Sequence, residues 1–104
     1  MNHNEKLVEI RREIDLLDGQ LIALFAARME LADKVAGLKR EANLALTDPA
    51  REEEVLSRAA AAVEAHLAGY ARIFMRSLME LSKQRQSDCL TGGAQAQTQT
   101  KTPS

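Results

Sequence analysis

The strongest constraint on this chain is a seam of apolar residues that begins near its start and recurs in alternating steps of four and three. Its members are Ile10, Ile14, Leu17, Leu21, Leu24, Leu31, Val35, Leu38 and Ala42. A mean spacing of about 3.5 residues is typical of a long, supercoiled α-helix. One step of the seam falls on Arg28 instead of an apolar residue. We therefore expect one helix from about Glu5 to about Asn43, with a cation on or beside its apolar seam.

A helix of this length is too long for the rest of the chain to cover. About 36 residues make a rod of roughly 54 Å, whereas a compact domain of about 100 residues is about 35 Å across. The chain has 104 residues, and aromatic side chains are only 3% of them. The seam is therefore predicted to meet another chain, and a two-fold homodimer is the commonest arrangement.

Two shorter helices are expected after the long one. Asp48 is a good N-cap and Pro49 a good first helical residue, so the second helix is predicted to start there and to run to about Ala65. The third is expected from about Tyr70 to about Ser87. Because good helix formers dominate the composition and β-branched and aromatic residues are few, the fold class is predicted to be all-α.

The end of the chain differs in composition from the rest. Residues 91–104 are mainly Thr, Gln, Gly and Ala, without helical periodicity. Such a segment is typical of a disordered tail. The expected organisation is a helical domain over residues 1–90, followed by this low-complexity tail.

Charge and cysteine content exclude several classes of partner and site. Fourteen Lys and Arg residues against fifteen Asp and Glu residues give a net charge of −1, which favours neither nucleic acid nor a membrane surface. One Cys and two His residues are too few for an internal disulfide or a structural zinc site. The start of the chain shows no signal-peptide pattern, and no apolar run reaches membrane-spanning length. We expect a cytoplasmic protein.

Three cations on the long helix are candidates for an anion site. Arg11 and Lys39 are 28 residues apart, which places them on one face of a supercoil, and Arg28 lies between them. A structural interpretation is that Arg28 sets the register or extends its charged end to solvent. A functional interpretation is a ligand site within a helical bundle, where Arg11 of one chain approaches Arg28 and Lys39 of the other.

Polar motifs occur on all three predicted helices in a distinctive order. The first helix carries LFAARMELA at 24–32, the second opens with DPARE at 48–52, and the third holds SKQRQ at 82–86. Together they resemble the all-helical class of chorismate mutase, over about residues 5–88. The second motif matches the Asp-x-x-Arg-Glu of that family, and the third matches its Ser-x-x-x-Gln.

This resemblance implies a fold and an activity. It implies an interlocked homodimer of a stand-alone, single-domain enzyme, in which Arg11 of each chain completes the site of the other. The implied reaction converts chorismate to prephenate by a Claisen rearrangement, in aromatic amino acid biosynthesis, with no cofactor and no metal. Such a reaction needs no nucleophile, so a site of Arg, Lys and Gln suits it.

The resemblance also implies a role for each matching residue. Arg11 from the partner chain and Arg28 would hold the two substrate carboxylates, which suit the planar guanidinium. Lys39 and Gln86 would donate hydrogen bonds to the ether oxygen whose bond to carbon breaks. The remaining positions are Asp48 and Glu52, which would engage the ring hydroxyl or the helix entry around it, and Arg51 and Ser82, which would add carboxylate contacts.

Two alternatives stay open on the sequence alone. An isochorismate-pyruvate lyase uses the same scaffold and a nearly identical site, although the complete second and third motifs favour the mutase. A non-catalytic helical dimerisation module would also have a long apolar seam. Such a module would favour Leu or Ile at position 28 and would show no preference at position 39 or 86.

Overall fold

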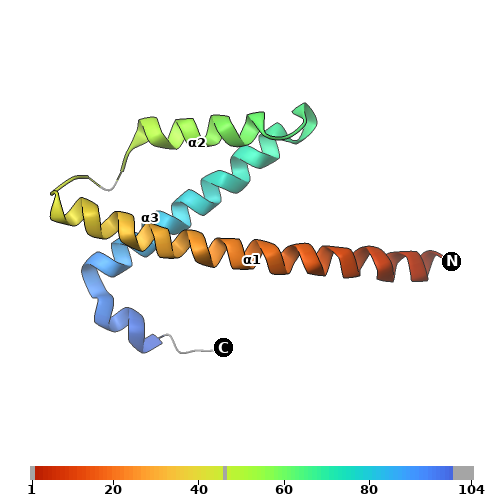
Figure 1. The fold of residues 1–104 in the computed structure, drawn as a ribbon, viewed down its shortest axis with the longest axis horizontal. Coiled ribbons are helices and arrows are strands. Elements are labelled where there is room, and N and C mark those ends of the chain that lie inside the picture. The colour runs from red at the N-terminus through yellow and green to blue at the C-terminus, as the bar shows by residue number, and fades with distance from the viewer. Residues whose placement is uncertain (1, 46, 100–104) are drawn as a thin grey trace. The chain divides into compact units, whose positions relative to one another are not determined.

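The structure, a computed structural model, describes residues 2–45 and 47–99, and side chains as far as residue 88. The described residues form the helices α1 (His3–Glu41), α2 (Pro49–Ala61) and α3 (Ala68–Gln99), with a 3₁₀ turn, η1 (Ala65–Leu67), before α3 (Figure 1). No strand occurs among them. The predicted all-α class and the order of one long helix followed by two others are confirmed.

Side-chain caps fix the start of α1. The backbone N–H of Glu5 donates to the Asn2 side-chain Oδ1 at 2.8 Å, and the N–H of Asn2 donates to the Glu5 Oε1 at 2.9 Å. This reciprocal pair is a capping box, which satisfies two donors that a helix start otherwise leaves without an intrahelical acceptor.

The end of α1 is equally well defined. Asn43 has a φ of 58°, in the left-handed region that Asn tolerates better than most residues. The N–H of Asn43 donates to the carbonyl of Arg40, and that of Leu44 donates to the carbonyl of Lys39 at 2.7 Å. These two bonds make a Schellman motif, so the helix stops beside Lys39 rather than running on into α2.

The prediction for the start of α2 is confirmed, whereas two later boundaries differ. The Asp48 Oδ1 accepts from the Arg51 N–H at 3.2 Å, and Pro49 opens the helix. α2 ends at Ala61 rather than near Ala65, and η1 lies between it and α3. α3 is continuous to Gln99, beyond the expected Ser87, as the Ala and Gln content of that stretch permits.

The predicted tail therefore falls partly within α3. Residues 91–99 belong to that helix, and residues 100–104 lie outside the described residues. The division into a helical domain over 1–90 and a separate tail stays a prediction.

The chain divides into two compact units, Met1–Leu31 and Ala32–Ser104. In the first unit, the seam residues of α1 are exposed, from Ile14 at 47% to Leu24 at 68%. In the second unit, the buried apolar side chains come from all three helices and are Ala32, Ala36, Leu56 and Met79. Among the residues that the structure describes, the buried apolar side chains therefore belong to the second unit, and the seam residues of the first unit are exposed.

Candidate active site

Two polar residues occupy core positions on α3. Ser82 is 7% exposed and Gln86 is 8% exposed, and both lie on the face of α3 that also buries Met79. Spacings of three and four residues place all three side chains on one stripe of the helix. Polar side chains are rarely buried without a reason, because burial removes their hydrogen bonds to water. This stripe is therefore the first candidate for a binding site.

The two buried polar groups differ in how their hydrogen bonds are satisfied. The Ser82 hydroxyl donates to the Leu78 carbonyl at 3.0 Å, a bond within its own helix. The Gln86 Oε1 is buried and has no hydrogen-bond partner in the structure. A buried polar atom without a partner costs about 1–3 kcal/mol. An amide that turns about its last side-chain bond can present either its oxygen or its NH₂ group, so Gln86 can accept from or donate to a bound molecule.

Two ion pairs join the same stretch of α3 to its neighbours. The Lys83 Nζ lies 3.2 Å from the Glu52 Oε2 on α2, and the Arg85 Nε lies 2.8 Å from the Asp33 Oδ1 on α1. Lys83 and Arg85 both lie between Ser82 and Gln86 in the sequence. The ion pairs therefore tie α3 to α2 and to the last part of α1, next to the buried polar stripe.

The electrostatics of the α2–α3 contact follow from these pairs. The carboxylate of Glu52, and to a lesser degree that of Glu80, raises the pKa of Lys83 above its ordinary value. Glu53 directly follows Glu52 on α2, and hydrogen bonds from Ser57 and Arg72 lower its pKa. Both shifts favour the charged forms, the carboxylate of Glu53 and the ammonium of Lys83.

Asp48 and Arg51 are both engaged locally on α2. The Asp48 carboxylate caps the helix, as its sequence position predicts. The Arg51 guanidinium lies 3.0 Å from the Glu54 Oε1, one turn further along the same helix, and both side chains are more than half exposed. Each contact uses only part of the side chain, because a carboxylate has a second oxygen and a guanidinium has further N–H donors that can meet a ligand.

The three predicted cations on α1 fall in different units. Lys39 is half-buried in the last turn of α1, within the second unit. Arg28 is half-buried and Arg11 is exposed, and both belong to the first unit. The second unit therefore contains six of the predicted site residues, which are Lys39, Asp48, Arg51, Glu52, Ser82 and Gln86.

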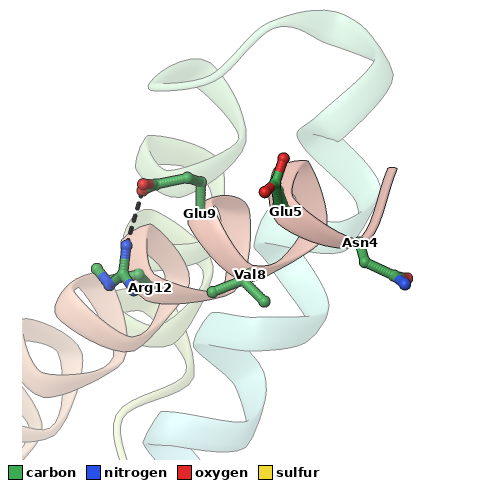
Figure 2. Close-up of a pocket in the computed structure, with 5 residues that line it drawn as sticks. All are labelled: Asn4, Glu5, Val8, Glu9 and Arg12. Atoms are coloured by element: carbon green, nitrogen blue, oxygen red, sulfur yellow. Dashed lines mark ion pairs between the residues drawn. The ribbon is translucent and has the colours of Figure 1, made fainter. Parts of the chain in front are cut away.

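A shallow pocket near the start of α1 contains none of the predicted residues. Figure 2 shows its lining, Asn4, Glu5, Val8, Glu9 and Arg12, all from the first turns of one helix. The Arg12 Nη1 lies 3.0 Å from the Glu9 Oε1 across it, and both side chains are more than half exposed. Since a single exposed helix face cannot enclose a ligand, this pocket is not a candidate active site.

The described part of the chain shows neither a metal site nor a membrane-spanning helix. No group of three or more His, Cys, Asp and Glu side chains in it could hold a metal ion. None of its helices is long and apolar enough to cross a membrane.

Sequence reasoning missed the two ion pairs beside the polar stripe. Asp33 and Arg85 are 52 residues apart, and nothing in the local pattern of either helix marks them as partners. Lys83 was visible only as one residue of the SKQRQ motif. Its only signal in the sequence was its position next to Ser82.

Comparison with known proteins identifies the family to which the chain belongs. The model of the family described as chorismate mutase type II matches residues 10–87. A protein of Methanocaldococcus jannaschii named chorismate mutase is 41% identical over 54 residues, which are 52% of this chain and 54% of that protein. No solved structure is significantly similar to the chain.

Two longer relatives match a smaller share of their own length. The T-protein of Haemophilus influenzae is 42% identical over 69 residues, 66% of this chain and 18% of that protein. The bifunctional chorismate mutase/prephenate dehydratase of Aquifex aeolicus is 37% identical over 54 residues, 52% of this chain and 15% of that protein. The matched stretch thus spans about half of the first relative and less than a fifth of these two. Because the family model covers most of the chain, including both motifs on α2 and α3, the chain belongs to the chorismate mutase type II family.

Proposed function

We propose that the chain catalyses the conversion of chorismate to prephenate, a step in aromatic amino acid biosynthesis. The observation that carries this proposal is Gln86, a buried amide whose Oε1 has no hydrogen-bond partner. It lies at the last position of the Ser-x-x-x-Gln motif, within residues 10–87 that match the family model. In a mutase, this amide can turn so that its NH₂ group, rather than its oxygen, faces the substrate and donates to the ether oxygen.

The proposed reaction moves bonds within one molecule. The carbon–oxygen bond of the enolpyruvyl ether breaks while a new carbon–carbon bond forms, and no group is lost or gained. Negative charge builds on the ether oxygen as its bond lengthens. Lys39 and Gln86 stabilise that charge as donors, and such preorganised donors are worth about 10²–10³ in rate each.

The remaining residues bind and orient the substrate. Arg28, and Arg11 of a second chain, pair with its two carboxylates, while Arg51 and Ser82 add further contacts to them. Asp48 and Glu52 lie at the start of α2 and engage the ring hydroxyl. Holding the flexible substrate in a compact, chair-like form lowers the entropic part of the barrier.

We also propose that the active form is a homodimer. The exposed seam of α1 supports this proposal, because Leu17, Leu24 and Leu31 are each more than half exposed in the single chain. Covering such a seam with a second copy removes apolar surface from water. It would also bring Arg11 of one chain to the site of the other.

The single cysteine fits a reducing compartment, so we place the enzyme in the cytoplasm.

The proposal is tested by incubating the purified protein with chorismate and following the loss of its ultraviolet absorbance, with prephenate identified as the product. A parallel incubation with isochorismate, analysed for salicylate and pyruvate, separates the mutase from the lyase. Formation of prephenate well above the buffer rate supports the proposal. Salicylate from isochorismate with little prephenate from chorismate, or no turnover of either, contradicts it.

A further inference from the structure

We propose that Lys83 is a positioning residue, which reaches from α3 to hold the Glu52 carboxylate in place for the substrate. This inference rests on the proposed function, because it assigns Lys83 to the same site. Lys83 acts through Glu52 and has no direct contact with the reacting atoms. The Ser-x-x-x-Gln motif specifies Ser82 and Gln86 and leaves position 83 open.

The geometry of the contact supports a positioning role. The Lys83 Nζ is 3.2 Å from the Glu52 Oε2, and the two side chains are 32% and 31% exposed. Lys83 directly follows the buried Ser82, so it leaves α3 at the edge of the polar stripe. A carboxylate accepts hydrogen bonds through both oxygens. With Lys83 on Oε2, the Oε1 of Glu52 can accept from a substrate hydroxyl.

A second carboxylate near Lys83 does not account for the contact equally well. The Glu80 Oε2 is 3.5 Å from the Lys83 Nζ, but it lies on the same helix and its side chain is 67% exposed. Ion pairs of this exposed, one-turn kind contribute little. Glu52 is the less exposed partner and belongs to the other helix. The Lys83 ammonium is therefore held chiefly across the α2–α3 contact.

The chain offers a matched control for a purely structural role. The Arg72 Nη1 lies 3.4 Å from the Glu53 Oε2, so this second ion pair also joins α3 to α2, one residue along from Glu52. Arg72 lies far along α3 from Ser82 and Gln86 and has no place in the proposed site. If the pairs only hold the two helices together, their loss should have similar effects.

The experiment compares the full-length variants Lys83→Met, Lys83→Arg and Arg72→Met in steady-state turnover of chorismate. We expect Lys83→Met to lower kcat/KM about tenfold, mainly through a higher KM, as for loss of one charge-assisted contact. Lys83→Arg should recover most of this loss, because it keeps the cation. Arg72→Met should stay within about twofold of the wild type, as for a surface pair. Thermal unfolding of each variant reports whether it is folded.

A second background shows whether Lys83 acts through Glu52. In a Glu52→Gln protein, Lys83→Met should add little further loss, because coupled residues are not additive. If turnover in that background is too slow to measure, the affinity for chorismate by calorimetry replaces it. The inference is overturned if Lys83→Met matches Arg72→Met, or if its effect is the same with Gln at position 52. An inactive wild type would instead refute the proposed function.

Discussion

The guanidinium of Arg85 binds both carboxylate oxygens of Asp33, with Nε 2.8 Å from Oδ1 and Nη2 2.9 Å from Oδ2. Two parallel hydrogen bonds of this kind fix the orientation of both side chains. The pair spans 52 residues of sequence and joins the last part of α1 to α3. Because Arg85 directly precedes Gln86, the pair also restrains the helix turn that carries the buried amide.

Removing this pair should cost stability more than an ordinary surface pair does. We expect Arg85→Met to lower the free energy of unfolding by about 1 kcal/mol, near the top of the range for partly exposed pairs, because its geometry is bidentate. Arg58→Met is the control, since Arg58 pairs with Glu54 at 3.4 Å within one exposed helix face. Urea unfolding of both variants measures the difference. Equal urea midpoints for Arg85→Met and Arg58→Met would contradict the stabilising role assigned to Arg85.

Gln86 should govern both the rate and its pH dependence. We expect Gln86→Leu to lower kcat by about 10²–10³ through loss of one donor at the ether oxygen. Gln86→Glu should be active only when acidified, because a carboxyl donates a hydrogen bond only when it is protonated. The wild-type amide donates at any pH, so wild-type activity should persist at neutral pH. Rate measurements across the acidic and neutral range check this, and a wild type that loses activity on neutralisation would refute it.

Arg28 separates an enzyme from a dimerisation module. Arg28→Leu makes the α1 seam more continuous, so association should be retained or strengthened. Activity should nevertheless fall by about 10² or more, because a substrate carboxylate loses its partner. Chorismate turnover and sedimentation of the same sample measure both properties.

The control for Arg28 is another cation of the same helix. Arg12→Leu removes an exposed residue that pairs with Glu9, and it should leave turnover within about twofold. Full activity of Arg28→Leu would show that the seam cation serves register alone.

Glu53 should contribute to stability in one pH range only. Its pKa in the folded protein is lowered by Ser57 and Arg72, so the contribution is complete above the pKa of the unfolded chain. It is lost as the pH falls through the lower, folded-state pKa. Glu53→Gln should therefore melt below the wild type at neutral pH and converge with it in acid. Circular dichroism melting curves check this, and a constant difference across the whole range would contradict it.

Features encoded locally could be predicted from the sequence. The spacing of the seam predicted α1, and the Asp48–Pro49 dipeptide predicted the start of α2, because helix periodicity and capping depend on neighbouring residues. The polar motif on the third helix singled out Ser82 and Gln86, which both prove to be buried.

Features that depend on contacts between helices could not be predicted. The partners of Lys83 and Arg85 are set by how α3 packs on its neighbours, and that packing leaves no mark in the local pattern. The end of α3 was also misjudged, because a stretch rich in Ala and Gln is compatible with helix even without an apolar face.

The central claim, an enzyme whose site is shared between two chains, is tested most directly by mixing two inactive variants. Each proposed site takes Gln86 from one chain and Arg11 from the other. Arg11→Ala and Gln86→Ala therefore each remove one of the two contributions to a site. A mixed dimer has one site with Gln86 from the first chain and Arg11 from the second. Unfolding the two variants together and refolding them at equal amounts should therefore restore about a quarter of wild-type chorismate turnover, since half of the dimers are mixed and each has one intact site. A mixture as inactive as its separate components, beside a wild type that survives the same treatment, would contradict the account.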